Sequence, residues 1–311
     1  MGAHKDTRPM NLLTLREVLA AAEDDGYAVG SFSCRYTPMI RPILHAAQEA
    51  RSPAIVQISQ KELSRYGSTP GEVAWEFYTA LVEEGITVPV VLHLDHTKDI
   101  AVIEDAIAAG FTSVMIDASD YPLDDNIVIT RRVTAYAHPR AISVEAELGR
   151  IGTTDFVETA SDEEMYTKPD EAGRFVRETT VDALAVSVGT AHGVYTVRQP
   201  TIDLARLAAI RAQTAVALVL HGGSGVPAAL MRQAITLPGG GVSKVNIATD
   251  LELAVLAALN RTERMSNGEC RALPPAELRS AQHAVASVVT EKMTDYLMSA
   301  KRVGEGQRVD R

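Results

Sequence analysis

The sequence contains only two cysteines, few aromatic residues and no long apolar run. Cys34 and Cys270 are too few for a disulfide framework or a cysteine zinc site, so a reducing compartment is expected. No segment approaches the ~20 apolar residues of a membrane span. The first residues, MGAHKDTRPM, lack the apolar core of a signal peptide. We therefore expect a cytoplasmic protein that is not bound to a membrane.

Basic residues are also fewer than acidic residues. The chain has 30 Lys and Arg against 40 Asp and Glu, which gives a formal net charge of −10. Nucleic-acid binding relies on an excess of positive charge, so this function class is not expected. The hydrophobic share of 46% and the charged share of 23% are typical of a globular protein.

What the chain does contain is a regular alternation of two kinds of segment. Eight short, continuously apolar segments are typical of strands buried on both faces, and helix-like stretches separate them. This alternation predicts a (β/α)8 TIM barrel that forms one domain over residues 1–311. The competing doubly wound sheet usually has fewer strands, and its Gly-rich dinucleotide fingerprint is missing. The predicted strands are 28–34, 54–59, 88–96, 113–118, 141–148, 183–189, 218–224 and 242–249.

Helices are expected between these strands, and an additional C-terminal helical arm at about 277–300. Two connections are unusually long: residues 149–168 and residues 262–276. Loops of this length are usually functional or disordered. The helical stretches are 38–51, 71–85, 98–109, 124–137, 169–178, 203–213, 226–235 and 250–260.

Polar residues gather at the predicted strand ends. Active sites of TIM barrels lie at the carboxyl ends of the strands. His96, His192 and His221 follow three of these strands, and imidazoles with nearby carboxylates are typical zinc ligands. His93 remains a rival ligand, because a twist at the strand end could turn either histidine inward. Carboxylates at strand ends are Asp95, Asp117, Glu145 and Glu147.

Glycine-rich turns follow the seventh and eighth strands. HGGSG, at residues 221–225, offers backbone N–H groups, and glycine permits close approach of a ligand. NIATD, at 246–250, ends in a helix start whose dipole attracts anions. These two turns are in the usual positions of a phosphate site in this fold.

Several segments together resemble the class II, zinc-dependent fructose/tagatose-bisphosphate aldolase family. The resemblance covers most of residues 11–260 and implies a (β/α)8 barrel, which agrees with the strand count. It implies a metal-dependent aldehyde-lyase of carbohydrate metabolism, such as glycolysis, that cleaves a ketose (bis)phosphate to dihydroxyacetone phosphate and an aldehyde. The segments are HLDH, SVMID, SVEAELGRIG, YTKPDEAGRFV, DALAVSVGTAHGVY, LVLHGGSGVP and SKVNIATDLELA.

The resemblance also implies roles for individual residues. His96, His192 and His221 match the zinc ligands, and Glu147 matches a further acid near the metal. Asp95 matches the aspartate that exchanges a proton with the substrate hydroxyl. Zn²⁺ would stabilise the negative charge that develops on the substrate oxygen, and the family also suggests a monovalent cation, Na⁺ or K⁺. The substrate-binding residues would be Ser59, Gly193, Gly222, Gly223, Ser224, Asn246, Ile247, Ala248 and Thr249.

The chain departs from the family pattern where the aldehyde would bind. The usual glutamate of the loop after the fifth strand is missing; Asp155 is nearest to its place, and Glu158 is a second candidate. Pro275 stands where the family has an arginine for the distal phosphate, with Arg271 and Arg279 as candidate replacements. A 1,6-bisphosphate should then lose its advantage over a 1-phosphate. Ser33 replaces a usual asparagine, and Thr97 a usual small residue.

Three functions are compatible with these residues. The first is an aldolase for an unidentified ketose phosphate, assembled as a homodimer or homotetramer. The second is a metal-dependent sugar-phosphate epimerase or isomerase on the same scaffold, which the altered loop acid would allow. The third is a non-catalytic partner subunit of an aldolase, although the three histidines and Asp95 argue against it.

Overall fold

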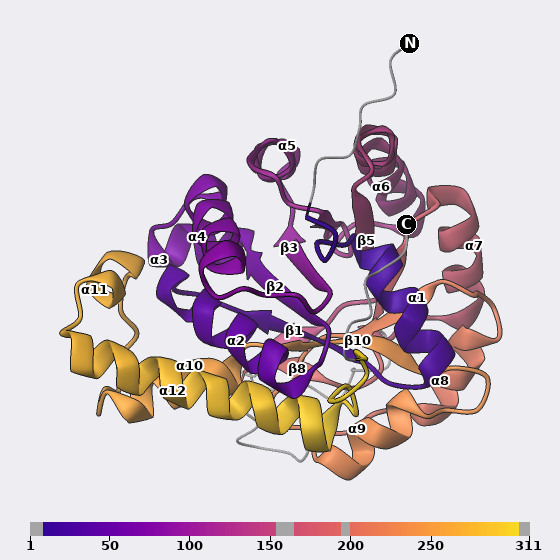
Figure 1. Cartoon of the computed structure of the whole chain (residues 1–311). Coiled ribbons are helices and arrows are strands. Elements are labelled where there is room, and N and C mark those ends of the chain that lie inside the picture. Colours follow the sequence, from indigo (N-terminus) through magenta and orange to yellow (C-terminus); the bar gives the residue numbers. More distant parts are fainter. Residues whose placement is uncertain (1–8, 154–164, 194–199, 305–311) are drawn as a thin grey trace.

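Eight parallel strands close into a barrel (Figure 1). The computed structural model describes residues 9–153, 165–193 and 200–304 of the 311-residue chain. Each predicted strand segment overlaps one strand of the barrel, so the TIM-barrel prediction is confirmed. Around the barrel the order is β1-β10-β9-β7-β5-β4-β3-β2. The strands are β1 (Val29–Ser33), β2 (Ala54–Ser59), β3 (Val90–Thr97), β4 (Ser113–Ile116), β5 (Ser143–Leu148), β7 (Ala183–Val186), β9 (Ala217–Leu220) and β10 (Val242–Ile247).

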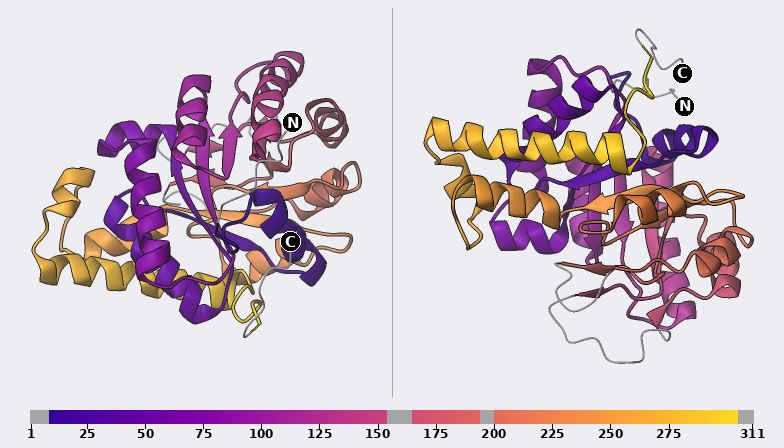
Figure 2. Two further views of the ribbon diagram at one scale, coloured as in Figure 1. Left: turned by 45° about the horizontal axis from the view of Figure 1, so that its top comes forward. Right: turned by 90° about the horizontal axis from the view of Figure 1, so that it is seen from below.

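Helices surround the barrel (Figure 2). Every predicted helical stretch overlaps one of them, with ends that differ by a few residues. The C-terminal helix α12 (Pro275–Glu291) packs against α2 and α10, and a π-helical turn at Lys292–Tyr296 continues it. No helix within the described ranges is both long and apolar enough to cross a membrane. The other predicted helices are α2 (Ile40–Ala50), α4 (Pro70–Glu83), α5 (Ile100–Ala109), α6 (Leu123–Ala137), α7 (Pro169–Thr179), α8 (Leu204–Arg211), α9 (Ala228–Ile235) and α10 (Thr249–Ala258).

Three further helices were not predicted. The helix α3 (Gln60–Tyr66) follows β2 directly, and α11 (Asn267–Arg271) lies within the long connection 262–276. The third, α1 (Leu15–Asp25), begins with a capping box between Thr14 and Glu17. Two-residue strands, β6 (Gly152–Thr153) and β8 (Ala191–His192), form a separate small sheet.

Helix α1 closes the amino-terminal end of the barrel. Its buried face forms one apolar cluster with side chains at the start of several strands, including Val29, Ile55 and Val91. The helix contacts β1, β3, β5, β9 and β10. Because this end is filled with apolar side chains, polar chemistry is confined to the carboxyl end.

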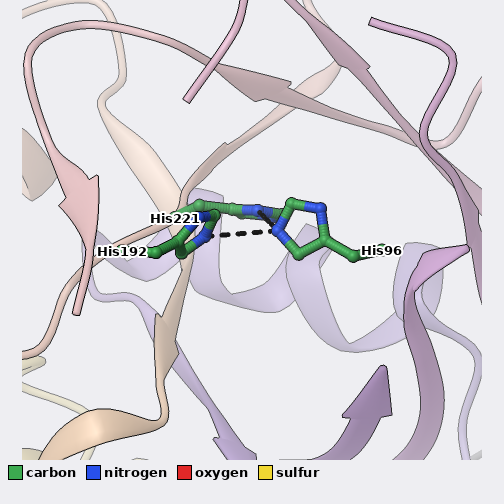
Figure 3. A group of neighbouring side chains, drawn as sticks. All are labelled: His96, His192 and His221. Carbon is green, nitrogen blue, oxygen red and sulfur yellow. Dashed lines mark hydrogen bonds between the residues drawn. The ribbon is translucent and has the colours of Figure 1, made fainter. Parts of the chain in front are cut away.

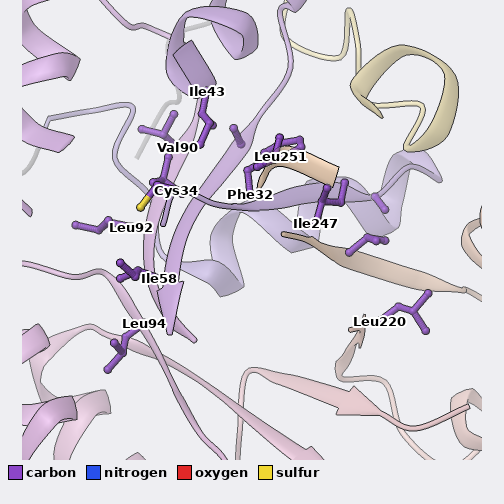
Figure 4. Close-up of a cluster of buried hydrophobic side chains, with 14 of the residues drawn as sticks. Phe32, Cys34, Ile43, Ile58, Val90, Leu92, Leu94, Leu220, Ile247 and Leu251 are labelled. Atoms are coloured by element: carbon purple, nitrogen blue, oxygen red, sulfur yellow. The ribbon is translucent and has the colours of Figure 1, made fainter. Parts of the chain in front are cut away.

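The larger apolar core lies between the strands and the outer helices (Figure 4). Val90, Leu92 and Leu94 of β3 belong to this outer core. Side chains alternate along a strand, so Val91, His93 and Asp95 face the barrel interior. The same alternation directs Lys244 and Asn246 of β10 inward, while Val245 and Ile247 pack in the outer core. Polar groups therefore fill the barrel interior toward the carboxyl ends of the strands.

Candidate functional site

A cavity of about 1010 Å³ opens at the carboxyl ends of the strands. Histidines, acids and glycines from five barrel strands or the turns that follow them meet here. The connections thus bring together residues that are up to 190 positions apart in sequence. The predicted site residues that line the cavity are Ser59, Asp95, His96, Glu147, His192, Gly193, Gly222, Ser224, Asn246, Ala248 and Thr249.

Three imidazoles converge beside this cavity (Figure 3): His96 and His192 line it, and His221 is fully buried next to them. Nε2 of His96 lies 3.2 Å from Nε2 of His192 and 2.7 Å from Nδ1 of His221. All three ring nitrogens lie within 4.8 Å of one another. Nitrogen ligands of a tetrahedral zinc ion are about 3.3 Å apart, given Zn–N bonds near 2.0–2.1 Å. The three rings therefore converge closely enough to share one metal ion.

A backbone irregularity turns His96 into the group. The pairing register between β3 and β4 shifts between Leu94 and Thr97, and His96 has a left-handed φ of +36°. Regular alternation would direct His96 away from the side that Asp95 faces. The bulge places the two consecutive side chains, Asp95 and His96, on the same cavity.

His93 has a different environment. Its Nδ1 lies 2.8 Å from the Ser113 hydroxyl, and its Nε2 lies 3.3 Å from the Lys244 ammonium nitrogen. Lys244 can only donate, so Nε2 accepts and the ring is neutral. Burial, together with the charge of Lys244, lowers the pKa of His93. This histidine belongs to the barrel interior, below the three-histidine group.

A buried ion pair supports His221 from below. The Lys244 ammonium lies 2.7 Å from Glu145 Oε2, and Glu145 Oε1 lies 2.9 Å from His221 Nε2. All three side chains are fully buried. Burial raises the pKa of Glu145, but Lys244 and His221 outweigh this effect and hold it at about 2. The carboxylate therefore accepts a hydrogen bond from Nε2–H of His221. This bond fixes the tautomer of His221, so that the lone pair on its Nδ1 is directed at the other histidines.

Removing the lysine should destabilise the whole barrel. In Lys244→Met the Glu145 carboxylate stays buried without a counter-charge, which typically costs about 3–5 kcal/mol. We expect a loss of this size in the free energy of unfolding, measured by urea denaturation. Lys168→Met is the control, because Lys168 is exposed and paired with Glu171 at the surface; its unfolding should match the parent. Equal stability of both variants would show that the buried pair contributes nothing.

Two acids border the histidines on the other side. Asp117 Oδ2 lies 3.3 Å from His96 Nδ1, so this carboxylate can orient the ring with Nε2 facing the group. Glu147 Oε2 lies 3.7 Å from Nδ1 of both His96 and His221. That oxygen is buried and has no hydrogen-bond partner among the described residues, and burial with the nearby Asp117 charge raises the Glu147 pKa to about 8. An orphaned carboxylate oxygen beside three imidazoles fits a divalent metal.

Two amides hold Asp95 at the cavity. Gln57 Nε2 lies 3.1 Å from Asp95 Oδ2, and Asn246 Nδ2 lies 3.1 Å from Oδ1. Gln57 is itself oriented by a hydrogen bond from Ser31. These bonds come from three different strands, so the carboxylate cannot rotate freely. They stabilise its ionised form, which is the form that can accept a proton.

The glycine-rich turns form the wall between β9 and β10. Ser224 Oγ accepts from the backbone N–H groups of Ala248 and Asp250, both at 3.2 Å, and so joins the turn to the start of α10. Gly222 has a φ of +66°, and a β-carbon there would overlap the Ala191 carbonyl oxygen. Only glycine fits this position.

Other predicted site residues lie away from the cavity or outside the described ranges. Gly223 is absent from the lining, and Ile247 packs in the outer core. Arg271 and Arg279 are exposed and do not line the cavity. Asp155 and Glu158 lie outside the described residues.

Sequence reasoning missed the groups that support the site. Lys244 and Gln57 were not named, and Asp117 was named only among the carboxylates at strand ends. Each is a polar residue within or just after an apolar strand. Gln57 precedes Ser59 by two positions, and Lys244 precedes Asn246 by two, so each pair shares a face. An inward-facing charge in a buried strand was the signal that could have identified Lys244.

Comparisons with known proteins agree with this geometry. The family model described as "Fructose-bisphosphate aldolase class-II" matches residues 13–302. A fructose-bisphosphate aldolase of Staphylococcus epidermidis is 35% identical over 287 residues, or 92% of this chain and 98% of that protein. The crystal structure of the YdjI aldolase from Escherichia coli K12 is 31% identical, with a TM-score of 0.79 over 94% of this chain and all of that chain.

A more distant structure extends the agreement in fold alone. Fructose-bisphosphate aldolase from Campylobacter jejuni is 21% identical, with a TM-score of 0.75 over 94% of this chain and 97% of that chain. The family model spans every strand of the barrel, and the 35% identical relative matches 92% of the chain. This chain therefore belongs to the class II fructose-bisphosphate aldolase family.

Proposed function

We propose that this protein is a zinc-dependent aldolase that cleaves a ketose phosphate to dihydroxyacetone phosphate and an aldehyde. The observation that carries the proposal is the convergence of His96, His192 and His221 beside a fixed carboxylate, Asp95. The three imidazoles would hold Zn²⁺, with Glu147 as a further or alternative ligand. When bound, the ion would act as a Lewis acid on the substrate carbonyl.

Asp95 is the proposed acid–base residue. In cleavage its carboxylate takes the proton from the C4 hydroxyl, and in synthesis it returns that proton. The amides of Gln57 and Asn246 hold the carboxylate oxygens in position for this transfer. A second base is needed at the carbon of dihydroxyacetone phosphate, and Asp155 remains our proposal for that role.

The phosphate of dihydroxyacetone phosphate would bind in the wall between β9 and β10. Gly222, Ser224, Ala248 and Thr249 line the cavity there, and Gly193 lines the same cavity from the connection after β8. Support comes from the positive end of the α10 dipole, which favours an anion at residues 248–249. Gly223 and Ile247 would act through the backbone, since Ile247 directs its side chain into the core.

A coupled assay for dihydroxyacetone phosphate tests the proposal. Fructose and tagatose 1-phosphates and 1,6-bisphosphates are supplied, with and without a chelator. We expect release from at least one ketose, loss of release with chelator, and recovery on adding Zn²⁺. Release of dihydroxyacetone phosphate at the same rate with and without the chelator would contradict a metal-dependent aldolase. Interconversion of ketoses without release would instead favour an epimerase.

The distal arginine of the family should have no substitute on α12. Arg279 is exposed and lies outside the cavity lining, as does Arg271. We expect Arg279→Ala and Arg271→Ala to leave the ratio of kcat/KM for 1,6-bisphosphate over 1-phosphate unchanged within about twofold. Steady-state kinetics on both substrates measure this ratio. A fall of ~10-fold or more, the scale of one charged contact, would assign the distal phosphate to that arginine.

A further inference from the structure

The cavity wall beyond β1 and β2 is basic, whereas the wall beyond β3, β4 and β5 is acidic. On the basic wall Arg35, Lys61, Arg65 and Arg264 line the cavity with a single acid, Glu62. On the opposite wall the acidic lining residues are Asp95, Asp117, Asp120 and Glu147, against the two basic residues Lys98 and Arg150. The polarity of the cavity therefore favours a negatively charged group on the β1–β2 side.

Arg35 is paired with two acids, the partly buried Glu62 and the buried Glu252. Arg35 Nε lies 2.9 Å from Glu62 Oε1, and its Nη1 forms an ion pair with Glu252. Glu62 also accepts from the Ser33 and Ser59 hydroxyls. The Arg35 side chain is only 12% exposed, so Glu62 and Glu252 neutralise its charge. Ser33 thus supports Glu62.

Arg264 differs from Arg35 in its exposure. Its Nε lies 2.9 Å from Glu252 Oε1, and Glu252 is fixed in turn by the Tyr66 hydroxyl at 2.7 Å. The Arg264 side chain is 52% exposed and lines the cavity. Its two terminal Nη groups make no hydrogen bond to any residue of the described ranges. One edge of the guanidinium is thus anchored, and the other donors remain available to a ligand.

The proposed function directs the substrate toward this wall. Dihydroxyacetone phosphate would occupy the β9–β10 wall, and the metal site lies above β3 and β9. The remaining wall for the aldehyde half is that of β1, β2 and α3. Arg264 reaches it from the connection after α10, eleven positions before Pro275, at which the family arginine was expected.

We propose that Arg264 binds a negatively charged group, a carboxylate or a phosphate, at the far end of the acceptor aldehyde. This inference rests on the proposed function, since it locates the second half of that substrate. A guanidinium presents paired N–H donors that match either anion. Lys61 and Arg65, exposed on α3 and without an ion pair to a described residue, add long-range attraction.

The test compares ketose 1-phosphates of one chain length that end in a hydroxyl, a phosphate or a carboxylate. Parent, Arg264→Ala and Arg264→Lys are assayed for release of dihydroxyacetone phosphate. We expect Arg264→Ala to lower kcat/KM about 10- to 100-fold for an anionic tail, through KM, the scale of one charged contact. For the neutral tail the change should stay within about threefold. Arg264→Lys should recover part of the loss. Comparison of the substrates that end in a phosphate and in a carboxylate identifies which of these two groups Arg264 prefers.

Binding provides a second readout that does not need turnover. The Kd values of the neutral and anionic ketoses are measured by calorimetry in zinc-loaded Asp95→Ala protein, with and without the additional substitution Arg264→Ala. Arg279→Ala in the same background is the matched control. An equal loss for neutral and anionic tails would overturn the proposal, because it would show that Arg264 only supports Glu252. So would equal affinity for all three tails when Arg264 is present. Absence of release from every ketose, with tail-dependent Kd values intact, would instead count against the aldolase.

Discussion

His96→Ala, His192→Ala and His221→Ala should each lose zinc and activity together. Removing one of three imidazoles leaves too few ligands for a tetrahedral site, and even supporting residues typically contribute 10- to 100-fold to metal affinity. We therefore expect zinc affinity to fall at least ~100-fold in each variant. Competition with a calibrated chelator gives the affinity, and release of dihydroxyacetone phosphate gives the activity.

Two further histidine variants make this result specific. His93 is bonded to Ser113 and Lys244, so His93→Gln should retain zinc wherever it folds. His45→Ala is the surface control, because His45 lies on α2 beside Glu49. Zinc retained in His96→Ala, His192→Ala and His221→Ala would refute the site. Zinc lost from His93→Gln in folded protein would return His93 to the list of ligands.

Asp95→Ala should separate metal binding from catalysis. The carboxylate is held by Gln57 and Asn246, and neither of these bonds involves the three histidines. We expect zinc content to match the parent while turnover falls at least about 100-fold, the usual scale for a positioned acid–base group. Metal analysis and steady-state kinetics on the same preparation measure both quantities.

The control for Asp95 is an aspartate outside the cavity. Asp170→Ala, on the exposed face of α7, should keep both zinc and turnover. Near-normal turnover in Asp95→Ala would show that the carboxylate only supports its neighbours. A joint loss of zinc and turnover would make Asp95 part of the metal site instead.

Much of this architecture could be read from local pattern. Parallel strands buried on both faces must be continuously apolar, so eight such segments were visible without any structure. Active sites of this barrel lie at the carboxyl ends of strands, which reduced the candidate residues to those that follow apolar runs. His96, His192 and His221 were found in this way.

Other features depend on contacts between distant segments. His93 and His96 could not be distinguished by spacing, because the choice was made by a bulge in β3 and by Lys244 from β10. Helix α1 escaped prediction although its inner face is fully buried, since it precedes the first strand and the alternation does not require it. Its role as the closure of the barrel appears only when five strands meet around it.

The sequence by itself determined the barrel and a set of histidines and carboxylates at strand ends, because both follow from short-range periodicity and from the rule that places chemistry at strand ends. The resemblance to the aldolase family then singled out His96, His192, His221 and Asp95 from that set. Only the tertiary structure decided which basic residues line the cavity. Arg271 and Arg279 looked suitable by position in the chain, yet both are exposed away from the cavity. Arg264 lines the cavity because its Nε donates to Glu252. Tyr66 and Arg35, from two other parts of the chain, hold Glu252 in place. Electrostatic contacts act through space, and spacing along the chain does not encode them.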